Sequence, residues 1–213
     1  LAEYVGGKIT VRVLLKKPYD VTENKIGLYV HRIGVVSTVV PDVAPTDPGI
    51  LSVGGFNIQV FGRSKMRKEG VPEILAEVVG RFDLLVVQEI RDASGEAIVQ
   101  LLDQVNESVS DPYEMVLSDR LGRTSSKEQY AFFYRPSKLT VMDQYHYADP
   151  MDEFEREPFL VRFQTVSGGK DFGVVALHAD PDDVPAELAA LEDVLIEAED
   201  LWNEEDLMVI GDL

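Results

Sequence analysis

At residues 83–92 the chain reads DLLVVQEIRD. The apolar run ends abruptly in polar residues, which predicts a buried strand that closes at the rim of a sheet. Such a strand would carry the carboxylate of Glu89 to the edge where α/β proteins gather their sites. Taken alone, Glu89 is also consistent with an acid at the N-terminus of a helix. The other segments of the sequence are needed to distinguish a residue at the edge of a sheet from an acid at the start of a helix.

Strands and helices are mixed on both sides of this segment. Helical spacing of apolar residues predicts helices at 71–82, 94–107 and 185–202, with Ile74 and Leu188 on the apolar faces. Strands are expected at 50–61, 129–136, 138–147, 159–166, 171–180 and 206–213. Because several strands follow one another directly, we expect an α+β fold of packed, mainly antiparallel sheets flanked by helices.

The first fifty residues have a different character. Residues 8–15 alternate between apolar and polar positions, and 28–40 is rich in apolar residues, so both predict strands. Residues 41–49, PDVAPTDPG, contain three prolines and a glycine, which is typical of a linker. We therefore expect a small β appendage of unknown role at 1–40, a linker at 41–49 and the main domain at 50–213.

Composition narrows the possible chemistry. The formal net charge of −18 fits a solvated acidic surface, or a protein that depends on divalent cations. There is no cysteine, which excludes disulfides, Cys–zinc sites and thiol nucleophiles. No apolar run reaches the roughly 18 residues that span a bilayer, so no membrane association is expected.

Four polar residues lie where strands are predicted to end: Asn57, Glu89, His178 and Asp212. Each alone is a weak signal, and a lone histidine is more often structural than functional. Together they suit a hard divalent cation held by carboxylate and amide oxygens. The imidazole would serve proton transfer.

Six segments in this order and spacing resemble the deoxyribonuclease I branch of the endonuclease/exonuclease/phosphatase superfamily. They read FNIQVFG, LLVVQEIRD, LGRTSSKEQYAFFYRP, FEREPFLVRF, VVALHADPDDVPAELAAL and LMVIGD. The match covers residues 51–213, and QEIRD, GRTSSKEQYAF and EREP are its most specific parts. The resemblance implies a four-layer sandwich, in which two packed β-sheets are flanked by helices.

The resemblance also implies roles for individual residues. Glu89 would hold a catalytic Mg²⁺ or Mn²⁺, and Asn57 would contact the metal shell or the scissile phosphate. Asp212 would lie beside the phosphate and the metal. His178 would be the acid/base imidazole, with Glu128 accepting its second N–H and thereby fixing the tautomer.

DNA contacts are implied for four further residues. Arg91 would enter the minor groove, Arg156 would meet a backbone phosphate, and Thr124 and Ser126 would line the same loop. The milder alternatives are ion pairs between near neighbours: Arg91 with Asp92, and Arg156 with Glu153 or Glu155.

Two positions depart from the family pattern. Gln59 stands where the family often has arginine, and Ser126 stands where animal members have a tyrosine that stacks on the minor groove. Gln59 removes one cationic contact, and Ser126 predicts weaker binding in the minor groove and a shifted cleavage preference.

An acidic loop follows the strand expected at 138–147. Asp149, Asp152 and Glu157 nearly match a structural Ca²⁺ site of the family, and three carboxylates suit Ca²⁺ geometry. A simply solvated acidic loop is the alternative.

The family's second half-site, with a second histidine, would follow Asp212 beyond the last residue of this sequence. We therefore expect a fragment with little nuclease activity of its own. The leading interpretation is a divalent-metal endonuclease that acts on DNA as a monomer, with secretion suggested by family analogy only. A phosphomonoesterase or phospholipase of the same superfamily, or an inactive binding module, are the alternatives.

Overall fold

A computed structural model describes residues 14–15 and 51–213. The expected appendage at 1–40 and linker at 41–49 therefore lie outside the described residues, apart from one two-residue strand. The helices are α1 (Arg63–Met66), α2 (Val71–Val79), α3 (Glu96–Ser108) and α4 (Val184–Trp202). The strands are β1 (Leu14–Leu15), β2 (Val53–Phe61), β3 (Leu84–Ile90), β4 (Glu114–Leu117), β5 (Gln129–Tyr134), β6 (Leu139–His146), β7 (Phe159–Thr165), β8 (Asp171–His178) and β9 (Leu207–Asp212).

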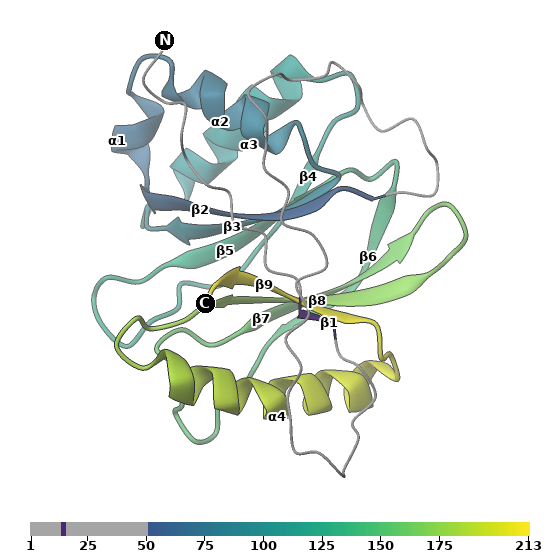
Figure 1. Cartoon of the computed structure of the whole chain (residues 1–213). Helices are drawn as coiled ribbons and strands as arrows, with labels where there is room; N and C mark the ends of the chain where they lie inside the picture. The colour runs from purple at the N-terminus through teal and green to yellow at the C-terminus, as the bar shows by residue number, and fades with distance from the viewer. Residues whose placement is uncertain (1–13, 16–50) are drawn as a thin grey trace.

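The described strands form two sheets, with the orders β1-β9-β8-β7-β6 and β2-β3-β5-β4. Pairing is antiparallel except between β2 and β3 and between β8 and β9. The sheets pack face to face (Figure 1). The helices α2 and α3 cover the outer face of the sheet that contains β3, and α4 covers the outer face of the sheet that contains β8. The expected four-layer α+β sandwich is thus confirmed.

The strand β3 shows why this sequence builds four layers. All seven of its residues are buried, and its side chains alternate between two cores. Leu84 and Val86 point into the core between the sheets, whereas Leu85 and Val87 point into the core beneath α2 and α3. A strand covered on both faces needs apolar residues at every position, which the run LLVV supplies.

Several boundaries differ from the sequence expectations. The helix α2 ends at Val79, before Gly80, and its Ile74 is 48% exposed. Leu188 on α4 is also exposed. Neither α1 nor β4 was predicted, because segments of four residues are too short to show a periodicity.

Gly211 allows β9 to lie against β8. The two strands pair in parallel, with Gly211 opposite Leu177. A Cβ atom added at Gly211 would lie 1.6 Å from the carbonyl oxygen of Leu177, which no side chain can tolerate. Any larger residue therefore has to push β9 away from β8, and Asp212 moves with it.

We expect Gly211→Ala to lower the free energy of unfolding by about 2–3 kcal/mol, because the backbone has to shift to make room. Urea unfolding measures this difference. Gly62→Ala is the control, since its added Cβ would meet its nearest neighbour at 3.6 Å, and it should change stability by less than about 1 kcal/mol. Equal stabilities of the two variants would contradict the close approach.

Candidate active site

The four residues expected at strand ends lie together, but only Glu89, His178 and Asp212 are at or next to the end of a strand. Asn57 lies in the middle of β2, where the register with β3 begins to shift. Glu89 is near the end of β3, and His178 and Asp212 close β8 and β9 as a pair in register. Asn57 on β2 joins the sheets, because its Nδ2 donates to Glu89 Oε1 at 2.9 Å and to Asp212 Oδ2 at 3.2 Å. Two carboxylates from different sheets thus share one amide.

Backbone irregularities aim Glu89 at this site. The pairing of β2 with β3 shifts register between Asn57 and Phe61, and Gln59 and Val60 have φ of 58° and 52°. Glu89 itself has a φ of 60°. Positive φ is costly for these residue types, above all for a β-branched valine, so the local fold has to impose it. In return, the Val60 N–H donates to Glu89 Oε2 at 2.7 Å and fixes the carboxylate.

Lys65 supports the bulge and was missed by the sequence analysis. Its Nζ donates to the carbonyl oxygens of Ile58 and Gln59, the residues at the start of the bulge. Lys65 lies on α1, which follows β2 directly, and its side chain reaches back to these carbonyls. No sequence signal marks this contact, because its acceptors are backbone atoms.

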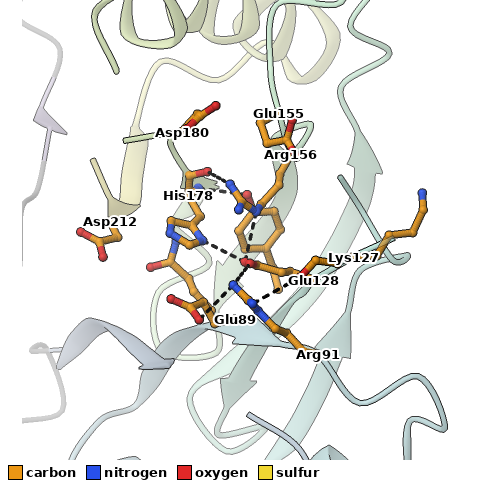
Figure 2. A network of polar contacts seen from close by, with 12 residues as sticks. Glu89, Arg91, Lys127, Glu128, Glu155, Arg156, His178, Asp180 and Asp212 are labelled. Atoms are coloured by element: carbon orange, nitrogen blue, oxygen red, sulfur yellow. Dashed lines mark hydrogen bonds and ion pairs between the residues drawn. The ribbon is translucent and has the colours of Figure 1, made fainter. Parts of the chain in front are cut away.

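Glu128 is the centre of the polar network in Figure 2, and its side chain is only 3% exposed. Its Oε2 accepts from His178 Nδ1 at 2.9 Å, so Nδ1 carries the proton. Burial raises the pKa of Glu128, but the His178 hydrogen bond and the charges of Arg156 and Arg91 outweigh burial and lower it. The carboxylate is therefore held in its ionised form.

Both arginines pair with Glu128. Arg91 Nη2 lies 2.6 Å from Glu128 Oε1, and Arg156 Nε lies 3.1 Å from Glu128 Oε2. The milder alternatives, near-neighbour pairs with Asp92, Glu153 or Glu155, are not what the structure shows. Asp92 instead caps the start of α3 by accepting from the Ala97 N–H at 2.9 Å.

Two buried side chains tie the sheets together below the site. Tyr130 on β5 accepts the His178 N–H at its hydroxyl oxygen at 2.9 Å. Burial raises the pKa of Tyr130, which keeps this hydroxyl protonated. Gln88 Nε2 donates to the Leu177 carbonyl at 2.9 Å. His178 is thus positioned from its backbone as well as from its ring.

The loop between β4 and β5 contributes the expected hydroxyl groups. Arg91 Nη1 donates to Ser126 Oγ at 3.3 Å, and the Ser126 N–H donates to Thr124 Oγ1 at 3.2 Å. Ser126 therefore lies within reach of the site through Arg91. Both hydroxyl residues are exposed, as a surface contact with a polymer requires.

The three acidic residues proposed for Ca²⁺ do not converge. Asp149 uses its carboxylate to accept the N–H groups of Glu153 and Phe154, at 2.8 and 3.0 Å. Asp152 is 83% exposed and pairs with Arg123 at 3.0 Å. In the described part of the chain, no three histidine or acidic side chains come close enough to hold a metal by themselves.

The donor set around Asn57 nevertheless suits one divalent ion. Mg²⁺ is usually bound by one or two carboxylates together with water and substrate phosphate, not by a cage made of protein alone. Glu89 and Asp212 provide two carboxylates that bind one amide, and in residues 51–213 no third acid or histidine joins them closely enough to form a metal cage. A phosphate ester would complete such a site.

Two packed sheets, flanking helices and a polar site made by both sheets define a class of α+β sandwich proteins. Within that class, the chain belongs to the endonuclease/exonuclease/phosphatase family, whose sequence model matches residues 54–213.

The relatives agree with this assignment. The chain is 40% identical to human Deoxyribonuclease-1 over 168 residues, which are 76% of this chain and 60% of that protein. It is 39% identical to the protein of the same name from Oryctolagus cuniculus over 170 residues, 77% of this chain and 60% of that protein. The chain thus spans about 60% of the length of these curated relatives.

Solved structures share the fold. A mannosyl-6-phosphatase from Bacteroides thetaiotaomicron matches with a TM-score of 0.53 and 16% identity over 76% of this chain and 65% of that one. The human Nocturnin catalytic domain with bound sulfate matches with a TM-score of 0.54 and 14% identity over 76% of this chain and 64% of that one.

None of the helices in the described part is long and apolar enough to cross a membrane.

Replacing Glu128 by glutamine should lower the free energy of unfolding at pH 7 by about 2–3 kcal/mol, less than for a fully buried pair because Arg91 is 32% exposed. The folded pKa of Glu128 is lowered, so its contribution is present above the ordinary carboxyl pKa of about 4.3 and is lost as pH falls through the folded value. Urea unfolding at a series of pH values should show the variant and the parent converging in acid. A constant gap down to pH 3 would contradict this role.

Lys65→Met should speed the hydrogen exchange of the Val60 amide by about tenfold. Methionine keeps the aliphatic part of the side chain but cannot donate to the carbonyl oxygens of Ile58 and Gln59, so the bulge opens more often. Exchange followed by NMR measures the rate. Lys68→Met changes the same charge at an exposed position of the same segment and should leave the rate unaltered. Equal rates in both variants would show that Lys65 does not hold the bulge.

Proposed function

We propose that residues 50–213 belong to a divalent-metal-dependent endonuclease that hydrolyses DNA phosphodiester bonds. The observation that supports this most strongly is the joint arrangement of Asn57, Glu89, His178 and Asp212, contributed by four strands of two sheets. The identity of about 40% to proteins named Deoxyribonuclease-1 favours DNA over other phosphate esters.

His178 is suited to move a proton at the reacting centre. Glu128 accepts from Nδ1, so the ring is fixed and Nε2 is left to face the substrate. Nε2 makes no hydrogen bond to any residue in the described part of the chain. Nε2 is therefore the ring nitrogen that would exchange a proton with a phosphate or leaving oxygen.

The arginines supply the charge that a polyanion requires. In a chain of net charge −18, phosphate binding depends on local cations. Arg156 would contact a backbone phosphate and Arg91 would reach the groove, with Thr124 and Ser126 on the loop beside it. Both arginines are already oriented by Glu128, so their positions are set before DNA arrives.

Glu89 would hold Mg²⁺ or Mn²⁺, with Asn57 and Asp212 beside it. A bound ion of this kind supplies positive charge to the phosphoryl and leaving oxygens. The protein's own contribution is to orient the Glu89 carboxylate through the Val60 N–H and the Asn57 amide.

The test is plasmid nicking by the full-length protein that contains this chain. With Mg²⁺ we expect nicking that EDTA abolishes. We also expect a loss of at least about 10²-fold for His178→Gln, because general acid–base catalysis contributes about 10²–10⁴. Glu89→Gln should lose activity to a similar degree.

Matched controls make this result interpretable. His146→Gln changes the same residue type on β6, where its ring stacks on Phe159 at 4.5 Å, and should retain activity. Intact plasmid together with phosphate release from a phosphomonoester would overturn the DNA assignment. Nicking at the same rate in Glu89→Gln would overturn the metal role.

A further inference from the structure

Glu187 is a buried carboxylate that the proposed chemistry does not use. It lies in the first turn of α4 and is only 1% exposed. Burying a charge is costly unless its oxygens find donors. Its contacts therefore have to explain why an acid occupies this position.

The two oxygens of Glu187 bind two different loops. Oε1 accepts the Glu155 N–H at 2.8 Å, and Oε2 accepts the Asp180 N–H at 3.2 Å. Glu155 directly precedes Arg156, and Asp180 is two residues after His178. Figure 2 shows Glu155 and Asp180 on the same side of the polar network, next to Arg156 and His178.

An ordinary helix-terminal role does not account for this geometry. An acid in a first turn is favourable through the free N–H groups of its own helix. Both N–H partners of Glu187 lie outside α4, on loops that follow β6 and β8. Burial raises the pKa of Glu187, and the two N–H groups oppose that effect.

The two loops also touch one another directly. Arg156 Nη1 donates to the His178 carbonyl oxygen at 3.4 Å, a long and weak contact. The two Glu187 hydrogen bonds, at 2.8 and 3.2 Å, are both shorter than this contact, and they use the two oxygens of a single carboxylate. They are therefore the stronger link between the backbone that carries the arginine and the backbone that carries the histidine.

We propose that Glu187 is a positioning residue, which fixes Arg156 and His178 relative to each other by clamping their two loops to the start of α4. This inference rests on the proposed function and deepens it. The side chains of Arg156 and His178 meet at Glu128, whereas Glu187 fixes the backbone segments that carry them. Glu187 itself touches no substrate.

The test compares Glu187→Gln with Glu192→Gln in the full-length protein. Glutamine offers one acceptor oxygen, so one of the two loops loses its anchor. Glu192 is an exposed acid of the same helix and gives the same change in charge. Should Glu187→Gln fail to fold, Glu187→Asp, which keeps the charge but is too short to reach both loops, takes its place.

The first readout is the imidazole Nδ1–H signal of His178 by NMR, without DNA. The chain has three histidines, so His178→Gln assigns the signal. We expect the signal to broaden or shift in Glu187→Gln and to stay unchanged in Glu192→Gln. An identical signal in all folded variants would overturn the proposal.

The second readout is the Kd for a DNA duplex in Ca²⁺, tested with and without Arg156→Ala. We expect Glu187→Gln to weaken binding by about tenfold, and to have almost no further effect once Arg156 is removed. The same loss in both backgrounds would mean that Glu187 does not act through Arg156. Absence of DNA binding by the parent would count against the proposed function, while the NMR readout would still decide the role of Glu187.

Discussion

The buried charge of Glu128 is the constraint around which the polar site is organised. A carboxylate that is 3% exposed has to be compensated, and the fold does so with two guanidinium groups and one imidazole. Each of these partners comes from a different segment of the chain. Satisfying one acid therefore orients Arg91, Arg156 and His178 together, and the order of the site follows from the cost of burying that charge.

The same logic applies to the sheets. Neither sheet holds the whole site, since Glu89 and Glu128 come with one and His178 and Asp212 with the other. The apolar layer between the sheets supplies most of the free energy that holds them together. The polar contacts at the edge fix how the two sheets are oriented, because the hydrogen bonds of Asn57 and Gln88 form in only one orientation of one sheet on the other.

Sequence alone predicted the main elements and the strand-end positions of Glu89, His178 and Asp212, because apolar periodicity and an abrupt change to polar residues are local signals. Asn57 instead lies in the middle of β2, before a shift in register that no local pattern predicts. It did not predict the partners of the arginines, since Glu128 is 37 residues from Arg91 and sequence proximity favoured Asp92. Lys65 and Glu187 were missed for another reason. Their side chains bind backbone atoms, which every residue has, so no pattern of residue types in the sequence predicts these contacts. The elements α1 and β4 were not predicted, because four residues are too few to show a periodicity of apolar positions.

The bulge of β2 has a consequence for how such a site can change over evolution. Val60 holds Glu89 with its backbone N–H, while the residue as a whole is 53% exposed, and neighbouring Gln59 is exposed as well. The support of the carboxylate is thus separated from the identity of the residues that provide it. Substitutions at these two positions can alter the exposed surface beside the site while leaving the backbone support of Glu89 in place, so the surface and the carboxylate can change independently.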